Sequence, residues 1–276
     1  MSFLRLYLAS GAGVTGLAIT LMVGAIAVFA DVPFPGNPWD MVARPLIWPL
    51  QAAAYPLGTD QLGRDIAAGL AHGARVSLIV GLVATAVSVG IGTLVGALSG
   101  WCGPLIADPL GRLTDMFQTM PFFIFALVIV LVMDPSIWST IIAIGVVTWP
   151  PVARLVRGEF LSLRNREFVQ ACQGMGMSDT RIILTQLLPN CSASLIVTSS
   201  VKVATAILTE SALAFLGLGD PNVISWGSMI GGGRSMLRTA WYLTALPGVA
   251  ILITVIGLNL IGDGLNQALN PRLRPR

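Results

Sequence analysis

Residues Glu167 to Pro189 read EFVQACQGMGMSDTRIILTQLLP, a polar segment between two apolar stretches of membrane length. A helical period places Phe168, Ala171, Cys172 and Met175 on one face, at i, i+3, i+4 and i+7. A stripe of about two turns is not stable alone in water. The segment is therefore predicted to form a short helix that docks, either onto its own bundle or into a groove of a separate protein.

Two glycines close this predicted helix, which spans about residues 166–178. Gly174 and Gly176 are expected to end it, because glycine adopts the left-handed conformation common after a helix C-terminus. Ser178 and Asp179 then provide cap residues for a second helix, which runs toward Pro189.

The composition indicates a polytopic membrane protein. Of 276 residues, 55% are hydrophobic and only 11% are charged, and the mean hydropathy is +0.81. A soluble domain carries about a quarter charged residues. The net charge of +3 comes without a basic run of the kind that binds nucleic acid. The three cysteines fit no metal-site spacing.

Six apolar windows approach the ~20 residues that a helix needs to cross the hydrocarbon. The first is longer than the apolar run of a typical secretory signal, so we expect an uncleaved span. The predicted spans are Leu6–Ala30, Val76–Gly100, Leu113–Met133, Ile137–Ala153, Ala193–Leu216 and Leu243–Leu260.

Arginine placement predicts the orientation, because cytoplasmic loops carry an excess of basic residues. With both termini inside, ten arginines fall on the cytoplasmic side and five on the outer side. The segment quoted above then faces the cytoplasm. All three cysteines lie on that reducing side and are predicted to be free thiols. The ten arginines are Arg5, Arg112, Arg154, Arg157, Arg164, Arg166, Arg181, Arg272, Arg274 and Arg276.

Two segments are predicted to lie outside. Asp31–Arg75 is rich in proline and should be irregular until about Asp60, after which Gly63–Ser77 is expected to form a helix at the membrane interface. The second segment, Gly217–Tyr242, carries two tryptophans, Trp226 and Trp241, that are typical of headgroup anchors.

A stripe of small residues marks one face of the second span. Small side chains spaced about four apart allow close helix packing, and a face of an opening and closing pathway is the alternative. The stripe consists of Gly81, Ala84, Ser88, Gly92 and Gly96.

Charged residues inside the bilayer are candidate functional residues, because a charge there faces water, a cavity or a partner. Lys202, the only lysine, lies near mid-depth in the fifth span. It is predicted to line a pathway or to form a structural ion pair. Glu210 lies nearer the outer side and is the second pathway candidate, although a structural role is favoured for it. The single histidine, His72, precedes the second span and is expected to be a solvated or capping residue.

Ten short motifs follow one another along essentially the whole chain: Leu57–Asp65, Gly73–Leu78, Ser162–Arg164, Arg166–Val169, Gly174–Gly176, Leu188–Asn190, Phe215–Gly219, Ser225–Gly227, Asn259–Leu265 and Leu269–Leu273. In their order and spacing, these motifs resemble those of the inner-membrane permease subunits of dipeptide, oligopeptide and nickel ABC importers, in the branch of the second of two paired permeases.

The resemblance implies an all-α fold of six spans, the type I ABC importer permease fold. The first span with a periplasmic loop would occupy residues 1–75, and a five-helix core would occupy residues 76–276. It implies a second homologous permease, two cytoplasmic ATPases that bind ATP and Mg, and a periplasmic or lipid-anchored solute-binding protein. The resemblance also implies that this chain lies in the cell (inner) membrane. It implies that the chain itself binds no cofactor.

The resemblance implies that residues Glu167 to Pro189 contain the EAA loop of the family. In such permeases this loop forms a coupling helix that binds in a groove of a cytoplasmic ATPase. The residues that would carry coupling are Glu167, Phe168, Gln170, Ala171, Cys172, Met175 and Gly176. Gln170 replaces the family's acidic residue and Cys172 replaces its second alanine, which puts a salt bridge from position 170 in doubt.

The chain lacks the GxxxxGK[ST] phosphate-binding loop, so its energy would come from partners. An intramembrane enzyme would need metal ligands or a nucleophile–base pair at depth, and the spans offer no histidine or acidic pair for this. A stand-alone channel would leave the docking helix unexplained. Among solutes, short peptides are favoured, with nickel or another non-peptide solute as the alternative.

Overall fold

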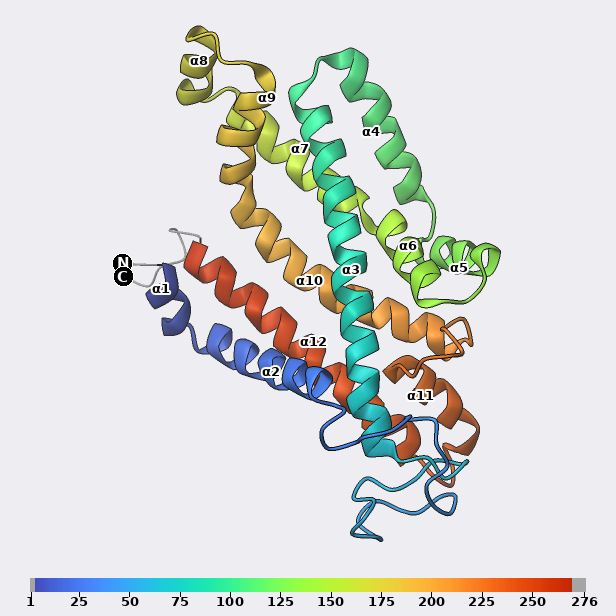
Figure 1. Ribbon diagram of the computed structural model, residues 1–276. Helices are drawn as coiled ribbons and strands as arrows, with labels where there is room; N and C mark the ends of the chain where they lie inside the picture. Colours follow the sequence, from blue (N-terminus) through green and yellow to red (C-terminus); the bar gives the residue numbers. More distant parts are fainter. Residues whose placement is uncertain (1–2, 270–276) are drawn as a thin grey trace.

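The computed structural model describes residues 3–269, a bundle of helices arranged about the long α3 (Figure 1). Within this range there is no β-strand, so the predicted all-α class is confirmed. The string from Asn270 to Leu273 and the basic residues Arg272, Arg274 and Arg276 lie outside the described residues, as does the side chain of Arg5. The helices are α1 (Phe3–Ala9), α2 (Gly11–Val28), α3 (Ile66–Trp101), α4 (Pro104–Thr119), α5 (Phe122–Met133), α6 (Ile137–Thr148), α7 (Pro150–Arg164), α8 (Glu167–Gly174), α9 (Asp179–Ile182), α10 (Leu188–Phe215), α11 (Trp226–Gly233) and α12 (Tyr242–Leu269), with a π-helical turn at Ile183–Leu187 and a 3-10 turn at Arg234–Met236.

The number of membrane crossings depends on two bent helix pairs. Four segments are long and apolar enough to cross unbroken: α2, α3, residues 179–215 and α12. The pairs α4 with α5 and α6 with α7 raise the number to six if each pair is one span. Six is the number that the sequence predicts.

The third and fourth predicted spans differ from straight helices. Leu113–Met133 is broken at Met120, where α4 and α5 meet at 89°, and Ile137–Ala153 is bent by 40° at Trp149. Prolines explain both breaks, because Pro121 and Pro150 lack the N–H that would continue the helical hydrogen bonding. Each of these two windows therefore contains parts of two helices rather than one straight span.

The second span is longer than predicted. α3 has 36 residues and, at about 1.5 Å per residue, a length of roughly 54 Å. Asp65 caps its start by accepting the backbone N–H of Ala67 at 2.8 Å. No break separates an interfacial helix from the span, so the predicted helix over 63–77 is the first part of α3 itself.

The stripe of small residues on α3 is a packing surface. A Cβ on Gly92 would lie 2.6 Å from Val152, and one on Gly96 would lie 2.6 Å from the carbonyl oxygen of Ala153. α3 and α7 therefore approach closely because these positions have no side chain. Of the two predicted roles for the stripe, close packing is the one that these distances support.

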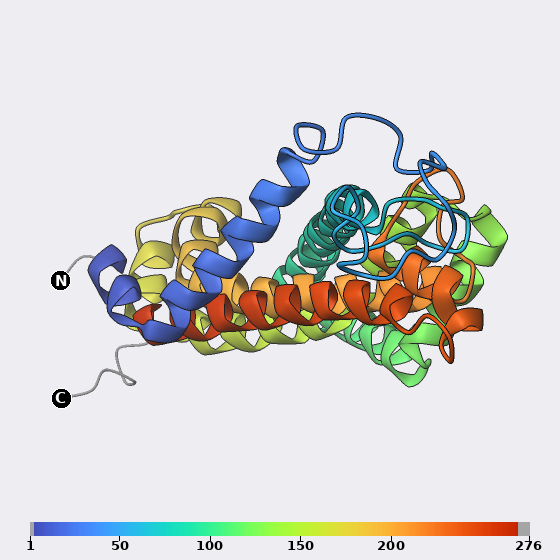
Figure 2. The ribbon, with the colours of Figure 1, turned by 90° about the horizontal axis from the view of Figure 1, so that it is seen from below.

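The two ends of the molecule differ in structure. α8 projects at one end, near the C-terminal end of α3, and the irregular loop of residues 29–65 lies at the opposite end, beside α11 (Figure 1). Seen from that end, the loop lies over the start of α3 (Figure 2). The segments predicted to be outside thus gather at one end, and the predicted coupling helix lies at the other.

The loop has no helix, as expected, but it is fixed by hydrogen bonds. The hydroxyl of Thr59 donates to the carbonyl of Arg44 at 2.8 Å and accepts the N–H of Ile47 at 2.9 Å. The Tyr242 hydroxyl donates to the carbonyl oxygens of Ile47 and Thr59. These bonds join the loop to the start of α12.

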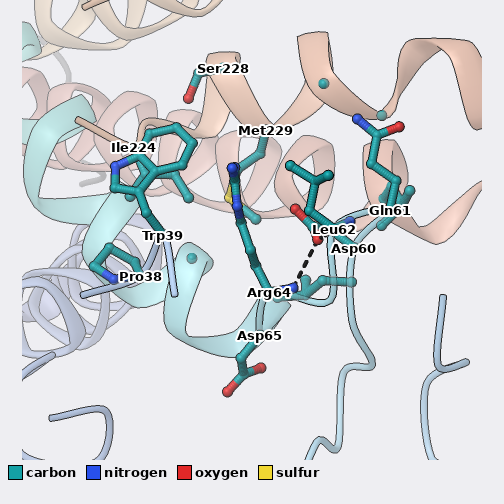
Figure 3. Close-up of a pocket in the computed structure, with 15 residues that line it drawn as sticks. Pro38, Trp39, Asp60, Gln61, Leu62, Arg64, Asp65, Ile224, Ser228 and Met229 are labelled. Atoms are coloured by element: carbon teal, nitrogen blue, oxygen red, sulfur yellow. Dashed lines mark hydrogen bonds between the residues drawn. The ribbon is translucent and has the colours of Figure 1, made fainter. Parts of the chain in front are cut away.

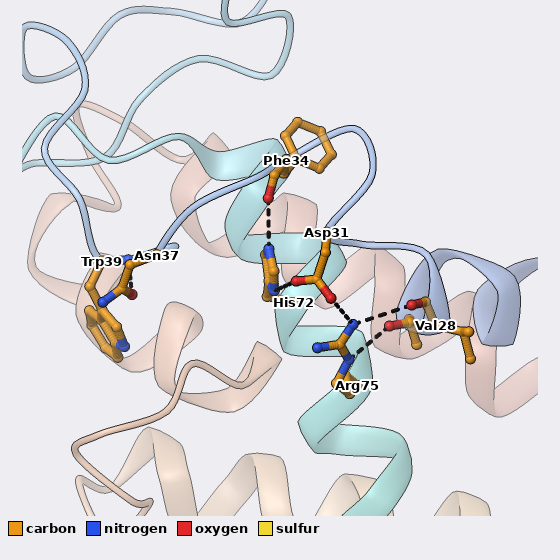
Figure 4. Close-up of polar contacts among 8 residues, drawn as sticks. Val28, Asp31, Phe34, Asn37, Trp39, His72 and Arg75 are labelled. Carbon is orange, nitrogen blue, oxygen red and sulfur yellow. Dashed lines mark hydrogen bonds and ion pairs between the residues drawn. The ribbon is translucent and has the colours of Figure 1, made fainter.

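A polar cluster joins α2 to α3 at the end of the bundle that holds the loop of residues 29–65 (Figure 4). Arg75 donates to the carbonyl oxygen of Ala27 at 3.0 Å and to the Asp31 carboxylate at 2.9 Å. The hydrogen bond from Arg75 holds the pKa of Asp31 below its ordinary value. His72 contacts the carbonyl of Phe34 at 3.2 Å and is buried, so its predicted solvation is wrong.

The two outer tryptophans have different roles. Trp226 is buried and donates its indole N–H to the carbonyl of Leu70 at 3.0 Å, so the expectation of a headgroup anchor is wrong for it. Trp241 is exposed, which agrees with that expectation.

Candidate functional site: the α8 helix and the polar groups within the bundle

The inner face of α8 is anchored to the bundle. Val169 is fully buried and Cys172 is 8% exposed. Both belong to an apolar cluster that includes Phe160 of α7, Ile182 of α9 and Leu187 of the π-helical turn. α8 therefore moves with the helices that follow and precede it.

The predicted glycine stop of α8 is a Schellman motif. Gly176 has φ +75°, and its N–H donates to the carbonyl of Gln173 at 2.9 Å. The N–H of Met177 donates to the carbonyl of Cys172 at 3.1 Å. Ser178 lies at the N-cap of α9 as predicted, but its side chain makes no capping hydrogen bond.

The outer face of α8 carries uncovered apolar side chains. Phe168 is 39% exposed and Met175 is 74% exposed, and Ala171 between them is also exposed. Glu167 and Gln170 are exposed beside them. The predicted stripe is therefore divided between two surfaces.

Cys172 does not belong to this exposed face, which corrects the predicted stripe. The helix is anchored along its Val169–Cys172 edge, and Cys172 lies at the border between that edge and the exposed residues. Val169 was missed as the anchor, although its position three residues before Cys172 was a signal for it.

An arginine joins the segment before α8 to α3. Arg164 donates to the carbonyl of Trp101 at 3.1 Å, and its guanidinium carbon lies 5.6 Å from the centre of that indole ring. The last turn of α7 is thus bound to the last turn of α3. A force applied to α8 would reach two membrane helices through packed and hydrogen-bonded contacts.

Lys202 bonds to a backbone carbonyl rather than to the acidic partner that one of its two predicted roles required. Its ammonium group donates to the carbonyl of Thr148, the last residue of α6, where the chain bends into α7. Thr148 in turn donates its hydroxyl to Ser88 of α3 at 3.1 Å. Within residues 3–269, Lys202 has no ion-pair partner, so the predicted structural ion pair is wrong.

Glu210 is buried among hydroxyl groups. Ser77 and Ser211 donate to one carboxylate oxygen at 3.4 and 3.3 Å, and Ser225 is a third hydrogen-bond partner. These contacts connect α10 to α3 and to the start of α11. They agree with a structural role.

The described residues contain no group of three or more metal-ligating side chains. The three cysteines, all within the described range, are free thiols as predicted. The candidate site therefore consists of α8, anchored on one side and exposed on the other, and a few buried polar contacts between helices.

An all-helical bundle with four to six candidate membrane spans and an anchored helix outside them defines a polytopic membrane protein. The chain belongs to the family of binding-protein-dependent transport system inner membrane components, whose model matches residues 92–275. It is the permease subunit of an ABC importer, and the resemblance in its motifs is confirmed.

Curated relatives match along nearly the whole chain. The di/tripeptide transport system permease protein DppC of Pseudomonas aeruginosa is 38% identical over 94% of this chain and 88% of that protein. The oligopeptide transport system permease protein OppC of Haemophilus influenzae is 34% identical over 93% of this chain and 82% of that protein.

A solved structure has the same fold. A chain of the MetNI methionine ABC transporter, in an inward-facing conformation, matches with a TM-score of 0.61 at 18% identity, over 73% of this chain and 96% of that chain. The predicted type I importer permease fold is therefore confirmed.

Proposed function

We propose that this permease forms half of a translocation pathway for peptides, beside a second, homologous permease subunit. The relatives named above are peptide transport permeases by name, at 38% and 34% identity. A nickel complex or another non-peptide solute is the alternative that the sequence left open.

The energy for transport would come from two cytoplasmic ATPase subunits, which bind the ATP and Mg, while this chain binds no cofactor. α8 would seat in a groove of one ATPase. One observation carries this proposal: α8 exposes Phe168, Ala171 and Met175 on one face while Val169 anchors the other face. An exposed apolar strip on an otherwise anchored helix fits a partner's groove.

The orientation follows from this contact. Both termini and α8 would lie in the cytoplasm, and the loop of residues 29–65 with α11 would face a solute-binding protein outside. In the inner membrane, this arrangement places the energy source and the solute on opposite ends of the bundle.

Lys202 remains a candidate pathway residue. Its hydrogen bond to the carbonyl of Thr148 leaves two of the three ammonium N–H donors free for a passing solute. Glu210, in contrast, has the hydroxyl groups of Ser77, Ser211 and Ser225 as partners and is proposed to hold α10 in place.

The test uses the complete transporter reconstituted in proteoliposomes with its ATPases, second permease and solute-binding protein. We expect Ala171→Asp to abolish uptake of labelled dipeptides and to weaken ATPase co-purification, because it places a charge in the docking strip. Gln173→Asp is the matched control, because Gln173 is exposed on the same helix away from that strip.

Normal uptake by the Ala171→Asp transporter would disprove docking through this face. Competition decides the solute: peptides should inhibit uptake, and inhibition by nickel alone would establish the alternative.

A further inference from the structure

A small cavity lies at the outer end of the molecule, between the loop of residues 29–65, the start of α3 and α11 (Figure 3). Its volume is about 130 Å³, which suits one side chain rather than a whole solute. Its wall includes Trp39, Asp60, Leu62, Arg64, Ser228 and Met229.

Arg64 enters this cavity without a partner for its charge. Its guanidinium carbon lies 4.5 Å from the centre of the Trp39 ring, and its Nε is buried without a hydrogen bond. In the described part of the chain, no carboxylate forms an ion pair with it. Burying a guanidinium N–H without a hydrogen bond costs free energy. An acceptor placed against Arg64 by a partner would therefore be stabilising.

The two neighbouring acids are engaged elsewhere. One oxygen of Asp60 accepts the backbone N–H groups of Leu62 and Arg64, at 2.8 and 2.9 Å. Asp65 caps α3 by accepting the N–H of Ala67, and its carboxylate points away from the guanidinium (Figure 3). Neither acid supplies the missing acceptor.

The loop holds Arg64 in a fixed position. Gly63 has φ +78°, and a Cβ there would lie 2.0 Å from the carbonyl oxygen of Ala43. The carbonyl of Gly63 accepts the N–H groups of Val42 and Ala43, at 3.0 and 3.2 Å. The guanidinium is therefore presented by a rigid turn, which lowers the ordering cost of binding a partner.

The loops at this end of the molecule carry exposed side chains of the kind found in protein interfaces. Exposed apolar side chains occur on the outer loops at Met41, Trp48, Leu50 and Trp241. Aromatic residues, methionine and arginine are the residues that protein interfaces favour. An anionic group presented by a protein would match both the unpaired charge and the apolar surroundings.

We propose that this cavity receives an acidic side chain of the docked solute-binding protein, whose carboxylate accepts hydrogen bonds from the Arg64 guanidinium. This inference rests on the proposed function and specifies one contact between this chain and the solute-binding protein. Arginine suits the contact because its planar fork donates two N–H groups to one carboxylate.

The first experiment measures binding of the cognate solute-binding protein to the complete transporter in nanodiscs by biolayer interferometry. We expect Arg64→Gln to weaken binding about tenfold or more and to flatten its dependence on NaCl. Arg44→Gln is the matched control, because Arg44 is an exposed arginine of the same loop that does not line the cavity, and its effect should stay within about twofold.

The second experiment identifies the carboxylate. The chain has one lysine, Lys202, which lies within the bundle, so Arg64→Lys introduces a single amine at the outer end. A carbodiimide should join that amine to the partner's acid as an amide, with loss of the activated oxygen as urea. Mass spectrometry should then locate the link on an acidic residue of the solute-binding protein.

Each outcome decides a different point. Equal affinity of Arg64→Gln and the wild type, or no link from Arg64→Lys to a partner that still binds, would overturn this inference and leave the proposed function intact. Failure of the wild type to bind any solute-binding protein would overturn both.

A substrate role for the cavity would also overturn it. In that case Arg64→Gln would leave binding of the solute-binding protein unchanged and would reduce uptake of peptides with a free carboxyl terminus more than that of amidated peptides. Co-purification of Arg64→Gln with the ATPases and the second permease serves as the folding control.

Discussion

Gly176 offers a sharp test of how the docking helix is held. Its φ of +75° is unfavourable for any residue with a Cβ, but nothing lies within 4 Å of the position where that Cβ would stand. Gly176→Val therefore introduces backbone strain without a steric clash. The left-handed conformation costs an L-residue about 1–2 kcal/mol, which is roughly a 5- to 30-fold change in an equilibrium constant.

A nearby glycine provides the control. Gly174 also has open space around it, but it lies within α8 and has no positive φ. Gly174→Ala should therefore leave the helix unchanged or stabilise it by up to about 1 kcal/mol. The two positions differ in backbone conformation, and both have open space where a Cβ would stand.

Hydrogen exchange in the reconstituted transporter measures the effect directly. The N–H groups of Gly176 and Met177 are hydrogen-bonded only if the Schellman motif is formed, so Gly176→Val should speed their exchange about 5- to 30-fold. We also expect more ATP hydrolysed per solute imported, since a frayed helix transmits force poorly. Wild-type exchange at Met177 in the Gly176→Val variant would refute the reasoning, as would the same acceleration in Gly174→Ala.

Three further predictions concern the bundle. Gly96→Leu should prevent α3 and α7 from packing, seen as loss of monodisperse protein in size-exclusion chromatography, whereas Gly90→Ala, with open space at its Cβ, should behave as wild type. Lys202→Ala should alter solute uptake with normal assembly of the complex, and unchanged uptake of every tested solute would reduce Lys202 to a structural residue. The lowered pKa of Asp31 favours the folded state at pH values above its ordinary value of 3.8, and this contribution is lost as the pH falls through the lowered folded-state value. Asp31→Asn should therefore remove that part of the acid dependence in thermal melts, and an unchanged acid dependence would show that the contact with Arg75 does not stabilise the fold.

The sequence alone determined which segments of the chain are long and apolar enough to be candidate membrane spans. Length and hydropathy locate the spans, because burial in lipid requires long apolar runs whatever the tertiary structure. Local chemistry also located α8 and its end, since the left-handed turn at Gly176 depends on a few adjacent residues. The order of the motifs was enough to predict the family.

Long-range packing decided the rest. The burial of Trp226 and the division of the α8 stripe at Cys172 depend on residues distant in the sequence, which a helical period cannot register. Lys202 shows the same limit: its depth was readable from the sequence, but its acceptor, the carbonyl of Thr148, is set by the contact of α10 with the end of α6. Periodicity gives the direction in which a side chain leaves its own helix, whereas only the assembled bundle determines what that side chain meets.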